Sequence, residues 1–216
     1  MSQILNDISE QLQKGRAKAV AQLVEQALAE GLAAADILQQ GLMPGMDIVA
    51  TKFKNNKVYV PEVLIAARAM NMGTTLLKPH LGEDSGAVIG KAVIGTVKGD
   101  LHDIGKNLVR MMLEGKGIEV IDLGVDVSPE AFVAAVKEHN ADVVALSALL
   151  TTTMGEMANT VKALEEAGLR ERVTVMVGGA PVTDHFCEEV GADVYTADAA
   201  SAADAAKEAI LARRAA

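Results

Sequence analysis

The segment "GTVKGDLHDIGKNLVRMM", residues 95–112, places a carboxylate two residues before an imidazole. Asp100 and His102 are followed by Gly105, in the pattern Asp-x-His-x-x-Gly. In an extended turn, side chains two residues apart point the same way, so Asp100 can accept a hydrogen bond from Nδ1 of His102 and leave Nε2 free. Carboxylates orient metal-ligating histidines in this way. The pattern therefore indicates one nitrogen ligand for a metal.

A zinc site would need two or three further ligands close to His102. The other histidines, His80, His139 and His185, fall on expected linker or helix segments without ligand spacing, and Cys187 is the single cysteine of the chain. We expect Cys187 to be a small core or surface residue. One nitrogen ligand suits a metal whose other ligands come from a macrocycle.

Three common sites of α/β proteins do not match these residues. Gly95, Gly99 and Gly105 have the wrong spacing for the G-x-G-x-x-G loop that binds dinucleotides. A phosphate-binding loop would need Ser or Thr after Lys106, where Asn107 stands. A phosphoacceptor domain would carry an aspartate after the third strand, where this chain has Ser147.

Residues 1–81 carry apolar side chains at helical spacing. Gly31 fits the end of a helix, and Pro44 and Pro61 fit the first turns of two others. This punctuation predicts about four helices, enough for a small bundle. Charge and glycine then interrupt the pattern over Leu81–Gly90, which we expect to be a linker and a hinge.

After the linker, short β-branched runs alternate with amphipathic segments. Five such runs predict a parallel sheet covered by helices on both faces. The predicted class is α/β: an N-terminal four-helix bundle followed by a flavodoxin-like, Rossmann-type five-stranded domain, with the order 2-1-3-4-5. We expect residues 1–85 to form the bundle with its linker and residues 86–216 to form the sheet domain. The runs are "KAVIGTV", "GIEVIDLG", "ADVVALSALL", "RVTVMVGG" and "GADVYTA".

In this fold the binding crevice lies beyond the carboxyl ends of strands 1 and 3. The polar and glycine residues follow strands 1, 3 and 4, whereas the segments after strands 2 and 5, around Val125 and Thr196, are less rich in them. The sequence therefore predicts a site at that edge of the sheet. The residues concerned are Asp100, His102, Asp103, Gly105, Ser147, Thr151, Thr152, Thr153, Gly178, Gly179, Ala180 and Pro181.

With these residues the chain resembles cobalamin-binding domains. The stretches "DLHDIG" (100–105), "SAL" (147–149) and "GG" (178–179) are similar to the D-x-H-x-x-G, S-x-L and G-G signature of that family. The helical first half, with "VYVPEVLIAARAMNMG", looks like the cap bundle that precedes the domain in methionine synthase and in corrinoid methyl-carrier proteins.

The resemblance implies a role for each matched residue. His102 would replace dimethylbenzimidazole as the lower axial ligand of cobalt, with Asp100 and Ser147 forming a hydrogen-bonded relay behind it. Gly105 would allow close approach of the ring, and the displaced nucleotide tail would pass Ser147 and Leu149 to reach the two glycines. Asp103 also fits the N-cap of the following helix. The implied cofactor contacts are Asp100, His102, Asp103, Ile104, Gly105, Ser147, Leu149, Thr151, Gly178 and Gly179.

Composition narrows the partners and the compartment. The chain has 216 residues and a net charge of −9, which argues against nucleic acid and anionic membranes as partners. The segment "MSQILNDISEQLQKG" lacks the basic flank and apolar run of a secretory signal, so we expect a cytoplasmic protein.

The resemblance implies a methyl carrier of one-carbon metabolism, a component of a corrinoid-dependent methyltransferase system. A substrate barrel of about 250 residues does not fit in this length, so we expect the chain to act with two separate methyltransferases. One would demethylate a methylamine, methanol, a betaine or an aromatic methyl ether, and the other would methylate tetrahydrofolate or coenzyme M. A reductive activator is a further expected partner. The alternative is a cobalamin-dependent sensor.

Overall fold

The computed structural model describes residues 3–81 and 88–215. The chain divides into two compact units, one made mainly of residues up to Val88 and one mainly of residues from Ile89. The expected boundary between residues 85 and 86 lies outside the described residues, as does most of the expected linker Leu81–Gly90.

The first unit is entirely helical in its described residues. Its helices bury an apolar stripe that includes Ile8, Leu12, Val24, Leu42 and Val63. α2 packs against α5 and α1, so the unit is a bundle, as predicted. Its elements are α1 (Gln3–Gln13), α2 (Ala17–Ala29), α3 (Ala34–Asp36), η1 (Ile37–Leu42), α4 (Met43–Lys54), α5 (Val60–Leu77) and η2 (Lys78–His80).

Pro44 occupies the first turn of α4, but α4 does not begin a separate helix. It continues from α3 through η1, a π-helical stretch in which the Met43 N–H donates to the Leu38 carbonyl. Proline has no N–H and breaks the ordinary i→i−4 bond, so the wider turn just before it keeps the helix continuous. Gly31 follows α2 at φ +86°, and Pro61 lies in the first turn of α5, both as expected.

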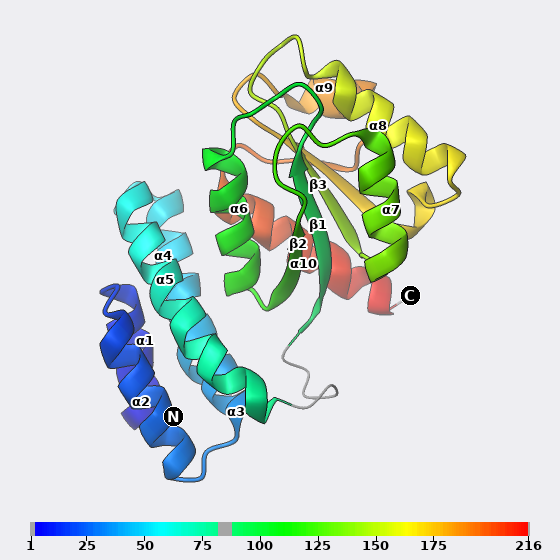
Figure 1. The fold of residues 1–216 in the computed structure, drawn as a ribbon. Coiled ribbons are helices and arrows are strands. Elements are labelled where there is room, and N and C mark those ends of the chain that lie inside the picture. The colour runs from blue at the N-terminus through cyan, green and yellow to red at the C-terminus, as the bar shows by residue number, and fades with distance from the viewer. Residues whose placement is uncertain (1–2, 82–87, 216) are drawn as a thin grey trace. The chain divides into compact units, whose positions relative to one another are not determined.

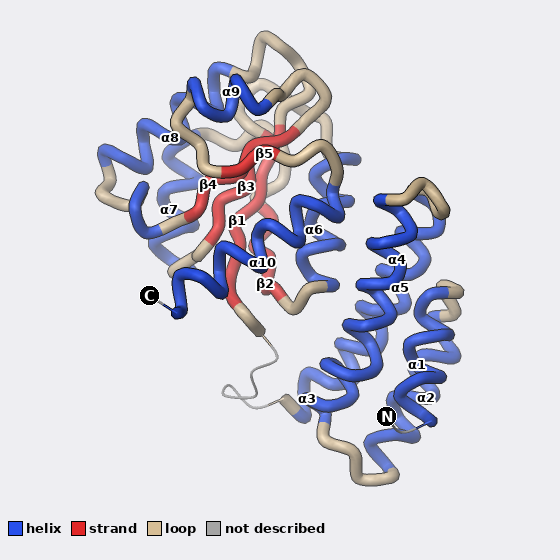
Figure 2. The backbone as a smooth tube through the Cα atoms, turned by 180° about the vertical axis from the view of Figure 1, so that it is seen from behind, coloured by secondary structure: helices blue, strands red, loops and turns tan. Residues whose placement is uncertain are grey.

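The second unit is a parallel sheet with the strand order β2-β1-β3-β4-β5, which is the predicted order. Figures 1 and 2 show α6 and α10 on one face of the sheet and α7 and α8 on the other. The elements are β1 (Gly90–Thr96), α6 (Ile104–Gly115), β2 (Ile118–Asp122), α7 (Pro129–His139), β3 (Val143–Ser147), α8 (Gly155–Glu166), η3 (Arg170–Arg172), β4 (Thr174–Gly178), α9 (Asp184–Glu189), β5 (Val194–Tyr195) and α10 (Ala199–Ala215).

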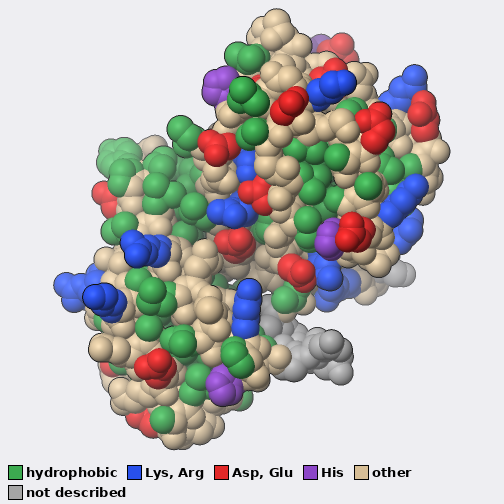
Figure 3. Space-filling model, in the orientation of Figure 1, with side chains coloured by type: hydrophobic (Ala, Val, Ile, Leu, Met, Phe, Trp, Pro, Cys, Tyr) green, Lys and Arg blue, Asp and Glu red, His purple; other side chains and the backbone are tan. Residues whose placement is uncertain are grey.

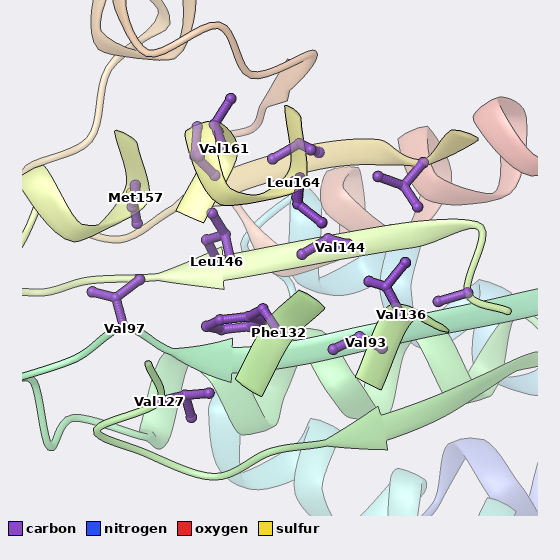
Figure 4. Close-up of a cluster of buried hydrophobic side chains, with 14 of the residues drawn as sticks. Val93, Val97, Val127, Phe132, Val136, Val144, Leu146, Met157, Val161 and Leu164 are labelled. Atoms are coloured by element: carbon purple, nitrogen blue, oxygen red, sulfur yellow. The ribbon is translucent and has the colours of Figure 1, made fainter. Parts of the chain in front are cut away.

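The core of this unit is continuous between the sheet and α7 and α8. Figure 4 shows Phe132 among valine and leucine side chains of β1, β3 and α8. Phe132 is fully buried, and a Cβ at Gly95 would lie 2.7 Å from its ring. Because helices cover both faces, the central strands are apolar without alternation, and they form a rigid base for the loops at their ends.

The surface is of mixed charge. On the face drawn in Figure 3, lysine and arginine side chains are interspersed with aspartate and glutamate. None of the helices in the described ranges combines the length and the apolar character that are needed to cross a bilayer.

Phe132→Ala should lower the free energy of unfolding by about 3–5 kcal/mol, because it leaves a cavity beneath β1. Phe186→Ala is the matched control, since Phe186 is only partly buried at the margin of the same core and should cost less than half as much. Urea titrations of the two variants measure the difference. Equal losses would contradict the central place given to Phe132.

Candidate functional site

The loops that follow β1 and β3 meet at the carboxyl edge of the sheet, where the strand order reverses. Asp100, from the first loop, is completely buried. His102, two residues later, keeps about half of its side chain exposed. A buried acid and an accessible imidazole therefore lie side by side at the predicted crevice.

The Asp100 carboxylate accepts five hydrogen bonds. Its Oδ1 lies 2.7 Å from Nδ1 of His102 and 3.1 Å from the His102 backbone nitrogen. Its Oδ2 accepts from the N–H of Leu149 at 2.8 Å, the N–H of Leu150 at 3.2 Å and the hydroxyl of Thr153 at 2.8 Å. With Nδ1 directed at an acceptor, the proton of the neutral ring resides on Nδ1, and Nε2 presents its lone pair outward.

These bonds keep the acid ionised. Burial by itself raises the pKa of the Asp100 carboxyl, but the hydrogen bonds from the Leu149 N–H, from His102 and from the Thr153 hydroxyl outweigh burial. Together they hold the pKa well below its usual range. Asp100 is therefore a fixed negative charge behind the imidazole.

The hydroxyl behind Asp100 belongs to Thr153 and not, as expected, to Ser147. Among the described residues, no hydrogen bond joins the Ser147 hydroxyl to Asp100. Ser147 is the last residue of β3, paired with Thr96 and Gly178, and the side chain of a strand stands on a face of the sheet. Asp100 lies beyond the strand ends, where the turn after β3 brings Thr153 back to it. The run Thr151–Thr153 was visible in the sequence, but nothing in it distinguished the third threonine; Thr151 and Thr152 are exposed.

The loop after β2, expected to matter less, fastens the turn that carries His102. The carboxylate of Asp126 accepts the Gly99 N–H at 2.7 Å, and the Asp126 N–H donates to the Asp100 carbonyl at 3.0 Å. Asp126 itself adopts φ +54°, a conformation that aspartate tolerates better than most residues. Backbone and side-chain bonds of this kind leave no clear sequence pattern.

The start of α6 is held by two polar contacts. Asp103 directly precedes the helix and its carbonyl accepts the Asn107 N–H, as an N-cap residue does, but its carboxylate bonds the Asn107 side chain. Lys106, almost fully buried, places its ammonium 2.6 Å from both oxygens of Asp122 at the end of β2. This ion pair, which was not predicted, ties the first turn of α6 to the sheet.

The glycines of the site are required for different reasons. A Cβ at Gly105 or Gly178 would meet nothing within 4 Å, so both border open space that a ligand could fill. Gly179 has φ +135°, and a Cβ there would collide with the carbonyl oxygen of Ala148. Gly179 is therefore required for close approach of the loops after β3 and β4.

An apolar rim is formed by the segments that follow β1, β2 and β3. Its large side chains are exposed although they are apolar: Leu101, Ile104, Val125, Leu149 and Leu150. Cys187 is buried, and within the described residues no group of three His, Cys, Asp or Glu side chains is placed to hold a metal ion. An outward nitrogen lone pair, an apolar rim and open space at two glycines fit a planar macrocycle that carries its own metal.

Thr153→Val should raise the pKa of Asp100 and lower the free energy of unfolding by about 1–2 kcal/mol, because a buried charge loses a hydrogen bond. Ser147→Ala is the control and should change the stability by less than about 0.5 kcal/mol. Urea unfolding and carbon NMR of the aspartate carboxyls measure both effects. The reverse ranking would restore Ser147 to the relay.

Asp100→Asn should cost about 2–3 kcal/mol at neutral pH, because an amide cannot accept all five bonds. The folded-state pKa of Asp100 lies below the ordinary value of 3.8, so its contribution is full above about pH 4 and is lost as the pH falls through the folded-state pKa. The stability gap between wild type and variant should therefore narrow below pH 4 in urea titrations. A gap that does not depend on pH would contradict the ionised state.

Comparison with known proteins agrees with this geometry. Residues 90–207 match the family described as "B12 binding domain", and residues 4–78 match a second family of that description.

The chain is 41% identical to dimethylamine corrinoid protein 2 of Methanosarcina acetivorans, over 97% of both chains. A cobalamin-binding protein from Desulfitobacterium hafniense superposes with a TM-score of 0.78 at 35% identity, covering 95% of this chain and 98% of that one. The methanol:cobalamin methyltransferase complex MtaBC from Methanosarcina barkeri contains a chain that matches with a TM-score of 0.89 at 30% identity, covering 97% and 80%. The protein thus belongs to the family of B12-binding corrinoid proteins.

Proposed function

We propose that this protein carries a methyl group on a corrinoid between a substrate-specific methyltransferase and a second methyltransferase that acts on a C1 acceptor. The observation that carries the proposal is the half-exposed imidazole of His102, whose Nδ1 is held by the buried, ionised carboxylate of Asp100 so that Nε2 is left free. When bound, the corrinoid supplies a cobalt centre that can accept a methyl group and yield it again.

The residues of the chain would bind the corrinoid and orient it. We propose His102 as the axial ligand of cobalt, with Asp100 and Thr153 behind it. The rim residues, with Gly105 and Gly178, would receive the ring and its nucleotide tail, which passes Ser147. The Asp100 carboxylate, 2.7 Å from Nδ1, would keep Nε2 available to the metal.

The relatives support a choice of donor and partners. One is named for dimethylamine and another belongs to a methanol methyltransferase complex, so we propose a methylated amine or methanol as the methyl donor. The second methyltransferase would transfer the methyl group to tetrahydrofolate or coenzyme M. A reductive activator and a cytoplasmic location complete the proposal. The alternative of a sensor is less favoured, because these relatives are named as corrinoid proteins and methyltransferase components.

His102→Gly should bind methylcobalamin but shift its absorption from the histidine-ligated to the unligated form, because only the axial nitrogen is removed. His139→Ala is the control, since His139 ends α7 at the opposite edge of the sheet. Visible absorption spectra of the reconstituted proteins show whether the cofactor is ligated by histidine. An unchanged spectrum in His102→Gly would refute ligation by this residue.

A pairing assay tests the carrier role itself. Protein reconstituted with cobalamin and reduced should change its cobalt spectrum when a methylated amine or methanol is added with the corresponding methyltransferase. The spectrum should revert when the acceptor and the second enzyme follow. A protein that binds cobalamin but fails with every donor pair would favour the sensor.

A further inference from the structure

We propose that the hydroxyl of Thr96 is a positioning group for His102. It would set the fraction of the protein in which the imidazole is oriented to ligate cobalt. The inference rests on the proposed function, but it can be tested without the cofactor. About half of the His102 side chain is exposed. Packing therefore does little to orient the ring, and hydrogen bonds must hold it.

Thr96 bonds the side of His102 that Asp100 does not reach. Its Oγ1 donates to the His102 carbonyl at 2.8 Å. The carboxylate of Asp100 holds the N–H and Nδ1 of the same residue. Among the described residues, no other hydrogen bond to the His102 carbonyl is found. Without the Thr96 hydroxyl, this carbonyl loses its hydrogen bond, and we expect the backbone of His102, and the ring that it carries, to move more freely.

Thr96 is a rigid anchor. It is the last residue of β1 and is fully buried. Its N–H donates to the Gly124 carbonyl and its carbonyl accepts from the Val127 N–H, both at 3.0 Å. The loop after β2 thus holds Thr96 in place, and Thr96 in turn holds His102. This connection to His102 is separate from the one that Asp126 makes.

Removal of the hydroxyl should leave the fold intact. Valine has the shape of threonine and favours strands, so it should keep the packing of the fully buried position 96. A structural effect and a positioning effect can therefore be separated.

The test uses two pairs that differ at the hydroxyl, wild type against Thr96→Val and Thr96→Ser against Thr96→Ala. Thr160→Val is the matched control, because Thr160 is equally buried and also donates to a backbone carbonyl at 2.8 Å, within α8. In the protein without cofactor, nitrogen NMR of labelled histidines should show a single tautomer for His102, protonated on Nδ1, in wild type, Thr96→Ser and Thr160→Val. Thr96→Val and Thr96→Ala should show a tautomer mixture and greater ring mobility.

In the protein reconstituted with methylcobalamin, the ratio of unligated to histidine-ligated cofactor should rise about fivefold in Thr96→Val. It should stay at the wild-type value in Thr96→Ser and in Thr160→Val. A wild-type tautomer and a wild-type ratio in Thr96→Val would overturn the inference. If Thr96→Val does not fold, equal behaviour of the serine and alanine variants would do the same. Should wild type bind cobalamin without histidine ligation, the proposed function fails, while the NMR comparison still decides the role of Thr96.

Discussion

The site depends on one buried carboxylate. The carboxylate of Asp100 is fully buried and is not solvated by bulk water. It stays ionised because it accepts five hydrogen bonds. Those donors come from its own turn and from the loop after β3, at residues 149–153. A single charge therefore joins two loops that are separated by about fifty residues of sequence, and the imidazole takes its direction from the same group.

The sheet order makes this possible. β1 lies between β2 and β3, so the loop after β1 has the β3 loop on one side and the β2 loop on the other. Asp100 reaches toward β3, whereas Gly99, Asp100 and Thr96 bond residues 124–127 through their backbone on the β2 side. The turn that carries His102 is thus held from both directions, although its imidazole stays half exposed.

This arrangement would suit the role proposed for His102, in which the imidazole binds a metal and releases it again. A tightly packed histidine would stay in one place, and a free one would seldom face the metal. Here hydrogen bonds give the direction and exposure leaves room for departure. The ion pair of Lys106 with Asp122 holds the first turn of α6, the helix that begins at the exposed Ile104.

Much of this could be predicted from the sequence. The change from helical to strand periodicity separated bundle from sheet, the count of β-branched runs predicted the strand order, and the two-residue spacing placed Asp100 against His102. These features are local, or follow from rules that hold for any parallel α/β sheet. The cofactor class came from the order of three short motifs.

Other parts were decided only by the tertiary structure. Thr153 replaces Ser147 behind Asp100, Asp126 and Thr96 hold the turn, and Lys106 is buried against Asp122, because each contact joins segments whose relative height depends on how their loops curl beyond the strand ends. Sequence periodicity reports which face of an element is buried, and it carries no information on the path of a loop. The sequence alone thus determined which residue types the site would use, and the folded backbone determined which of several equivalent hydroxyls and carboxylates came within hydrogen-bond distance.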